Sequence, residues 1–94
     1  MDKWKELIET LKEKNWIGEP FLECKVKSIE ESMRRWRELL EKDPSSPKMD
    51  ELSRKMFSDF DWLSGYIGCM RDAGMLDDGK WMDLKKELRR AMKP

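Results

Sequence analysis

The chain of 94 residues contains no histidine. Histidine is the commonest general acid–base residue and the commonest neutral metal ligand, so its absence removes the usual basis for catalysis and for metal binding. The chain has only two cysteines, Cys24 and Cys69. Two cysteines without histidine do not make a zinc site. Both lie inside helical patterns and far apart, so we expect reduced thiols that pack as small core residues.

Net charge and long apolar runs are also missing. The 20 acidic residues balance the 20 basic residues, which removes the simplest electrostatic reason to bind nucleic acid or an anionic membrane. No apolar run approaches the roughly 20 residues that cross a bilayer. Residues 1–11 are charged throughout, unlike a signal peptide. We therefore expect a cytoplasmic protein without a membrane partner.

Charged side chains are abundant instead. They make up 43% of the chain, against roughly 25% in an ordinary domain. Disordered chains combine low hydrophobicity with high net charge and few aromatic residues, whereas this chain has zero net charge and five tryptophans. Its length allows one small core and no second one. We therefore predict a single folded domain over residues 1–94.

Apolar residues at helical spacing predict an all-α fold. In the stretch that organises the chain they recur at alternating spacings of four and three, at Leu22, Val26, Ile29, Met33, Trp36 and Leu40. With the shorter stripes elsewhere, this pattern predicts helices near residues 3–14, 20–42, 47–73 and 79–92. The short connections between them predict a small four-helix bundle, or a long helical hairpin with two shorter helices packed on it.

Two local features allow more than one interpretation. The second helix could begin near Pro20, which suits a first helical turn, or near Ser28, which could form a capping box with Glu31. We favour Pro20, because a short strand before Ser28 would have no visible partner.

Gly65 and Gly68 lie inside the third helix, where each glycine costs about 0.5–1 kcal/mol relative to alanine. They could mark a kink or a close approach by another helix.

The connections carry signals for helix ends. Asn15 tolerates the left-handed conformation in which helices often stop. Asp77 or Asp78 is placed to cap the last helix. In the turn after the first helix, we expect Trp16 and Ile17 to fold back onto the core.

No arrangement typical of catalysis is apparent. The chain has no Gly-rich phosphate loop. Asp59 and Asp61 point to different sides of a helix, so they do not form an acid–base pair. Asp72, Asp77 and Asp78 lack the ligand spacing of a calcium loop. We therefore predict a non-enzymatic protein without a catalytic residue, a cofactor, a metal or a small-molecule substrate.

The five tryptophans and eight methionines exceed what a core of this size usually contains. Tryptophan anchors protein interfaces, and methionine adapts to irregular partner surfaces. We predict that Trp62 is partly exposed and that it contacts a protein partner together with Tyr66, Asp59 and Asp61. Our first functional hypothesis is an adaptor, an assembly subunit or a small inhibitor, of the kind that phages and mobile elements carry. Such a protein would bind another protein or itself, as a homodimer.

A second hypothesis rests on the basic residues of the last helix. The candidate contacts to a nucleic acid or an acidic partner are Lys85, Lys86, Arg89, Arg90 and Lys93. Basic residues near a helix C-terminus also favour the helix dipole and keep the surface soluble. No aromatic residue lies among them in the sequence to stack on a base, which favours that structural explanation. Nucleic-acid binding is therefore the alternative function.

Overall fold

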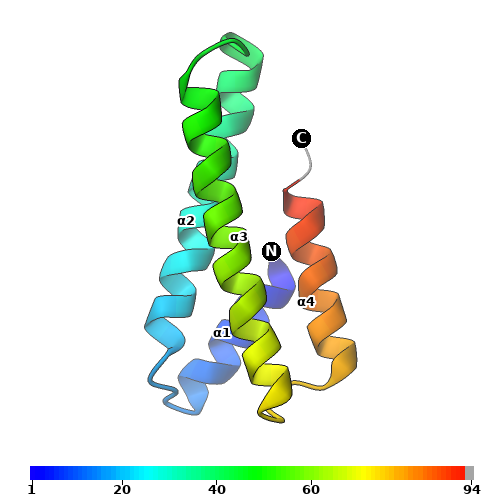
Figure 1. The fold of residues 1–94 in the computed structure, drawn as a ribbon. Coiled ribbons are helices and arrows are strands. Elements are labelled where there is room, and N and C mark those ends of the chain that lie inside the picture. Colours follow the sequence, from blue (N-terminus) through cyan, green and yellow to red (C-terminus); the bar gives the residue numbers. More distant parts are fainter. Residues whose placement is uncertain (93–94) are drawn as a thin grey trace.

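The computed structural model describes residues 1–92, which fold into four α-helices. They are α1 (Asp2–Glu13), α2 (Glu19–Lys42), α3 (Lys48–Asp72) and α4 (Asp78–Ala91) (Figure 1). Each helix begins and ends within one residue of its predicted bounds, so the predicted all-α fold is confirmed. The second helix begins at Glu19, in agreement with the start near Pro20.

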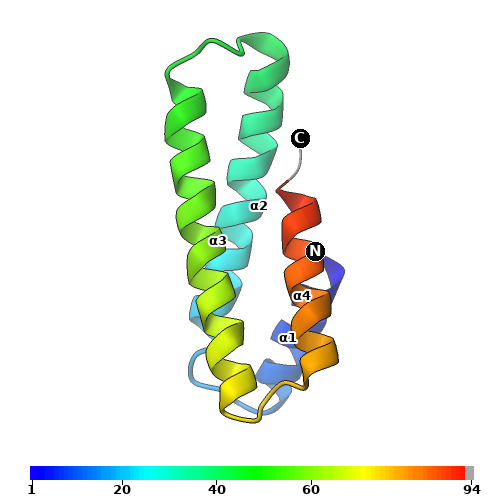
Figure 2. The same ribbon diagram turned by 45° about the vertical axis from the view of Figure 1, so that its right-hand side comes forward.

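The two long helices form an antiparallel hairpin on which the short helices pack. Helix α2 has 24 residues and α3 has 25, whereas α1 has 12 and α4 has 14. Helices α1 and α4 cover one face of the lower half of the hairpin (Figure 1, Figure 2). We call this covered side the inner face and the opposite side the outer face. The tip of the hairpin rises well beyond the ends of α1 and α4.

The core lies between the lower half of the hairpin and the short helices, and all four helices contribute to it. Trp4 is fully buried, and its indole Nε1 donates a hydrogen bond of 3.0 Å to the carbonyl of Leu84. Along α2 the predicted stripe is buried from Leu22 to Met33. It becomes only half-buried at Trp36, beside the end of α4, and is exposed at Leu40, near the end of α2.

Two kinds of contact hold the helix ends. Asn15 adopts a φ of 54°, and Asp77 accepts a hydrogen bond of 2.7 Å from the backbone N–H of Lys80, so both local signals are confirmed. The other contacts join distant parts of the chain. Glu87 accepts hydrogen bonds from the N–H groups of Lys3 (2.9 Å) and Trp4 (3.2 Å), at the start of α1. Arg37 of α2 donates to the carbonyl of Ala91, at the end of α4, over 3.2 Å.

Of the two interpretations of the glycines in α3, the close approach by another helix is wrong. A methyl group at Gly65 or Gly68 would have no neighbouring atom within 4 Å. Helix α3 continues through both positions as one element. These glycines therefore leave open space beside the helix, and no neighbouring backbone requires them.

Two burial predictions are also wrong. Cys24 and Cys69 are exposed, because each lies about 200° around its helix from the buried residue two positions before it. Ile17 is 90% exposed and Trp16 is also exposed. The turn is short, and the N–H of Glu19 already bonds to the carbonyl of Trp16, so the chain enters α2 before it can fold back.

Candidate functional site

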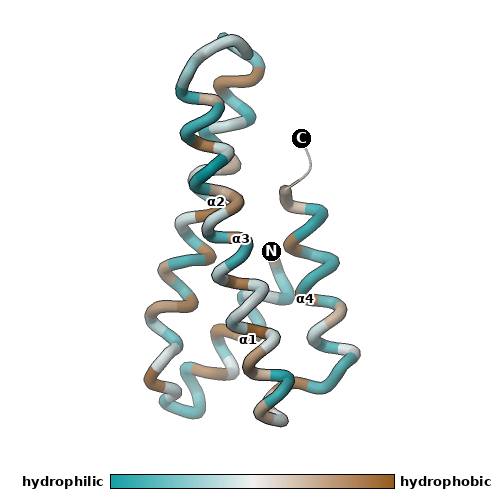
Figure 3. Tube along the Cα trace, in the orientation of Figure 1, coloured by the Kyte–Doolittle hydropathy of each residue, from teal (hydrophilic) through white to brown (hydrophobic). Residues whose placement is uncertain are grey.

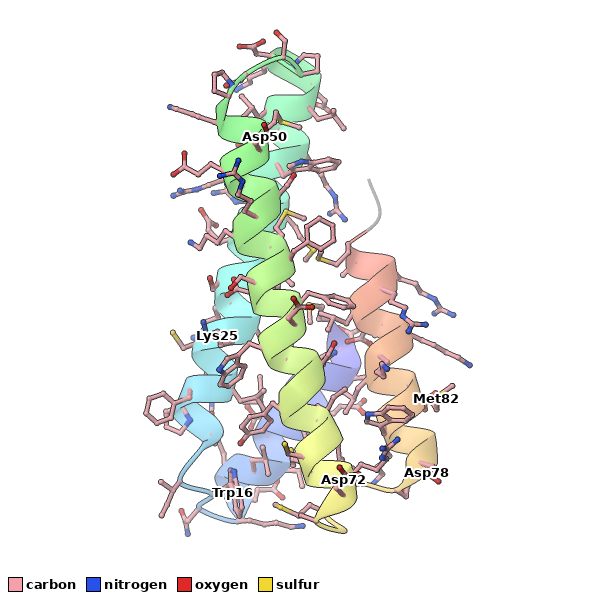
Figure 4. The ribbon with its side chains drawn as sticks, in the orientation of Figure 1. Trp16, Lys25, Asp50, Asp72, Asp78 and Met82 are labelled. Atoms are coloured by element: carbon pink, nitrogen blue, oxygen red, sulfur yellow. The ribbon has the colours of Figure 1, made fainter. Side chains whose placement is uncertain are left out.

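Aromatic side chains from α3 and from the turn before α2 form a connected row. Trp62 and Tyr66 stack with ring centroids 5.2 Å apart and an interplanar angle of 20°. Trp16 donates a hydrogen bond of 2.8 Å from its Nε1 to the Tyr66 hydroxyl. The ammonium group of Lys25 lies 5.6 Å from the centroid of the Trp62 ring. Trp16 lies at the lower end of the molecule and Lys25 above it on α2 (Figure 4).

Two strongly exposed side chains extend this row. Phe21 is 67% exposed and lies one helical turn before Lys25. Ile17 precedes Gly18, where a methyl group would come within 2.6 Å of the Tyr66 hydroxyl, so the turn packs closely on that ring. We call this set the outer aromatic surface, and its residues are Trp16, Ile17, Phe21, Trp62 and Tyr66.

The sequence analysis identified two of these five residues, Trp62 and Tyr66, and missed Trp16, Ile17 and Phe21. The signal for Phe21 was available, since it lies about 100° around α2 from the buried Leu22 and so outside the buried stripe. No comparable signal existed for Ile17, because its exposure depends on the path of the turn.

The two predicted acidic contacts do not belong to this surface. Asp59 is only 4% exposed and is a buried link between α3 and α2, which corrects its prediction as a partner contact. It accepts a hydrogen bond of 2.9 Å from the Ser28 hydroxyl and pairs with Lys25 over 3.5 Å. Asp61 is exposed, but it lies about 100° around α3 from Trp62 and faces another side of the molecule.

A second apolar surface lies on the inner face of the hairpin, above the ends of α1 and α4. Hydrophobic positions continue along both long helices to this height (Figure 3). Phe57 is 61% exposed and Leu40 is 37% exposed, although both would suit a core. We call this set the hairpin-tip surface, and its residues are Trp36, Leu40, Met49, Phe57 and Phe60, of which Trp36 and Phe60 are half-buried and also pack against the core.

One of the basic residues of α4, Lys85, lies near an aromatic ring, which the sequence analysis did not expect. The Lys85 ammonium lies 4.5 Å from the centroid of the Trp81 ring, and the Arg71 guanidinium lies 4.0 Å from it. Two cations already engage that ring, which leaves it poorly placed to stack on a base. Lys86, Arg89 and Arg90 are exposed on the same helix, and Lys93 lies outside the described residues.

A charged network joins α1 to the start of α2. Lys12 contacts Glu23 over 3.2 Å and Glu19 over 4.0 Å, and Lys27 contacts Glu23 over 3.1 Å. Burial raises the pKa of Glu19 above its ordinary value. Hydrogen bonds from Lys27, from the Glu19 side chain and from Lys12 lower the pKa of Glu23 to about 2. Because every partner is on α1 or α2, the network serves to fix the angle between these helices.

Two specific features are absent from residues 1–92. There, no three or more acidic or cysteine side chains come together in a way that could hold a metal ion. The helices of this part of the chain are also too polar or too short to cross a membrane. Comparison with protein-family models, with curated proteins and with solved structures gave no match. The two apolar surfaces and the basic side of α4 are therefore the features from which a function can be argued.

Proposed function

We propose that this chain is a non-enzymatic protein-binding module, such as an adaptor, an assembly subunit or a small inhibitor, that contacts its partner through the outer aromatic surface. The observation that carries the proposal is the exposure of Ile17, which follows Trp16 in the chain, and of Phe21, one helical turn before Lys25, at the end of a fixed row of aromatic rings. Burying one such side chain stabilises a complex by roughly 1.5–3 kcal/mol. These two side chains would act as the anchors of the interface.

The rings beside the anchors are already ordered in the free protein. Trp62 and Tyr66 are held by their stacking, and Trp16 is held by its hydrogen bond to Tyr66. A partner therefore loses little binding free energy to the ordering of these side chains. The Tyr66 hydroxyl accepts from Trp16, which leaves its own O–H to donate. The expected partner thus presents an apolar groove or helix face with a hydrogen-bond acceptor at its edge.

The experiment compares two surfaces of the same molecule. The double variant I17S/F21S removes the anchors of the outer aromatic surface, and Phe57→Ser is the matched control because Phe57 is similarly exposed on the hairpin-tip surface. Immobilised wild-type protein and both variants are incubated with a lysate of the source cells, and the retained proteins are quantified by mass spectrometry. Circular dichroism checks that each variant is folded.

We expect at least one protein to be retained by the wild type and by Phe57→Ser but about tenfold less by I17S/F21S, since 1.4 kcal/mol corresponds to a factor of ten. Titration with that purified partner should give the same ranking. If all three proteins retain the same partners in equal amounts, the outer aromatic surface is not the binding site.

One observation favours the alternative function. Lys86, Arg89 and Arg90 form no ion pair with any side chain of residues 1–92, so their charge is available to phosphate groups. A nucleic-acid binder would show affinity for labelled DNA or RNA that falls steeply between 50 and 200 mM salt, by about ten-fold or more for a few phosphate contacts. Neutralising these three residues would abolish it. Our proposal predicts no such affinity.

A further inference from the structure

The tip of the hairpin is built like half of a four-helix bundle. The last turns of α2 and the first turns of α3, on either side of the connection 43–47, rise beyond the ends of α1 and α4 (Figure 2). Two helices with an apolar face need further helices to cover that face. Below the tip, α1 and α4 provide that cover. At the tip, nothing among residues 1–92 covers it, and Phe57 and Leu40 are exposed there.

The arrangement of the short helices restricts how a second copy could cover the tip. Helices α1 and α4 occupy the inner face of the lower half. If two copies packed with their hairpins parallel, their short helices would collide. With the hairpins antiparallel, each tip covers the other and points toward the ends of α1 and α4 of its neighbour. Such a pair is related by a twofold axis, the commonest symmetry of protein dimers.

The charges beside the hairpin-tip surface fit that twofold axis. Leu39 lies three residues before the end of α2 at Lys42, and Leu52 lies four residues after the start of α3 at Lys48, so the two lie at nearly the same height in the antiparallel hairpin. A twofold axis at this height runs α2 of the second copy in the opposite direction to α2 of the first. The residue two positions before Leu39 in one copy then lies beside the residue two positions after Leu39 in the other copy. Arg37 of one copy then lies beside Glu41 of the other. Both residues line the groove that also contains Ala91, and Arg37 already donates a hydrogen bond of 3.2 Å to the carbonyl of Ala91, so this pair lies beside the end of α4.

The same axis gives a second pair of opposite charges on α3. The residues two positions before and after Leu52 are Asp50 and Arg54. Both are exposed, and they follow the helical spacing of Phe57, which places them along the edge of the hairpin-tip surface. Asp50 lies near the tip of the hairpin (Figure 4). One axis therefore pairs opposite charges on both helices, and a C2 contact has to be self-complementary in this way.

We propose that two copies of this chain associate through their hairpin-tip surfaces as an antiparallel, twofold-symmetric dimer. Phe57 and Leu40 of each copy become buried, and the two tips together form a four-helix core. The covered segment is short and two helices wide, so the interface buries on the order of 1,000 Å² in total, which is the size class of weak complexes. A dissociation constant in the micromolar range is expected. The inference is independent of the proposed function, because it uses another face of the hairpin.

The test is sedimentation velocity of the purified chain between about 5 and 500 µM, a range that brackets micromolar dissociation constants. The wild-type mass should rise with concentration from 11.3 kDa toward twice that value and no further. Phe57→Glu should remain a monomer throughout. The matched control Phe21→Glu, on the outer aromatic surface, should dimerise like the wild type. Circular dichroism reports whether each variant folds.

A charge exchange tests the geometry without touching the apolar residues. Asp50→Arg places like charges beside Arg54 of the other copy at two symmetric positions, so the dissociation constant should rise on the order of fivefold. The double exchange D50R/R54D should restore it. The proposal is overturned if the wild type stays monomeric at 500 µM or reaches a mass above that of the dimer. It is also overturned if Phe21→Glu abolishes dimerisation, or if the double exchange D50R/R54D fails to restore association.

Discussion

Glu19 and Glu23 lie one helical turn apart, and their surroundings shift the pKa values of their carboxyl groups in opposite directions. Burial raises the pKa of Glu19, so the folded state favours its neutral form. That stabilising contribution is fully present below the pKa of the unfolded chain and is lost as the pH rises through the folded pKa. The pKa of Glu23 is lowered from 4.5 to about 2, so its contribution is present above about pH 4.5 and is lost as the pH falls toward 2.

We expect the substitutions Glu19→Gln and Glu23→Gln to have different effects on the free energy of unfolding. At pH 7, Glu19→Gln removes a charge that is unfavourable when buried, so the protein should be as stable as the wild type or more stable. Glu23→Gln weakens contacts to Lys12 and Lys27, so it should destabilise the protein at pH 7 and flatten the loss of stability between pH 4.5 and 2. Urea unfolding at several pH values measures both effects.

The exposed Glu13 provides the control, because Glu13→Gln removes a charge from the end of α1 outside this network. It should change stability by less than about 0.5 kcal/mol. A greater loss of stability at pH 7 in Glu19→Gln than in Glu23→Gln would contradict this explanation of the network.

At the scale of helices, local signals define where each element ends, and contacts between distant residues hold the elements together. Helix α1 is capped by Glu87, and α4 ends on a hydrogen bond from Arg37. Helix α3 contains Gly65 and Gly68 without a neighbour that requires them, so glycine there only lowers the stability of the helix.

We therefore expect Gly65→Ala and Gly68→Ala each to raise the free energy of unfolding by about 0.5–1 kcal/mol. Gly74 is the contrasting position, because it follows α3 with a φ of 78°, which is unfavourable for alanine. Gly74→Ala should lower stability by about 1 kcal/mol or more. Thermal unfolding followed by circular dichroism ranks the three variants. Destabilisation by Gly65→Ala would show that the open space beside α3 is filled in solution.

The bounds of the helices could be predicted from sequence because their signals are local. The period of the apolar residues, the left-handed Asn15 and the cap at Asp77 all act within a few residues. The contact of Glu87 with the start of α1 could not be predicted, because more than 80 residues separate the partners. Within the candidate site, periodicity identified Trp62. It did not reveal that Asp59 is buried, because its burial requires α2 to pack on that side of α3.

At the scale of the whole molecule, a narrow helical body of 44 × 22 × 19 Å carries two exposed apolar surfaces on different faces. The outer aromatic surface lies at the lower end, and the hairpin-tip surface lies where the short helices stop. The zero net charge adds no general repulsion between copies or toward a partner. Each surface can therefore be tested with the other as its control.

The exposed cysteines report directly on the central claim that a partner covers the outer aromatic surface. Cys24 lies one turn after Phe21, and Cys69 lies one turn after Tyr66. The measurement is the rate of alkylation of both thiols by N-ethylmaleimide, read by mass spectrometry, for the purified protein and for the same protein in a lysate of the source cells. The I17S/F21S variant in the same lysate is the control.

We predict rapid alkylation of both thiols in the purified protein, at every protein concentration, because the proposed dimer leaves the outer face free. In the lysate both rates should fall about tenfold for the wild type, as expected when about nine-tenths of the protein is bound, and should remain high for the I17S/F21S variant. Equal rates for the wild type in the lysate and in the purified state would contradict the claim that a partner covers this surface.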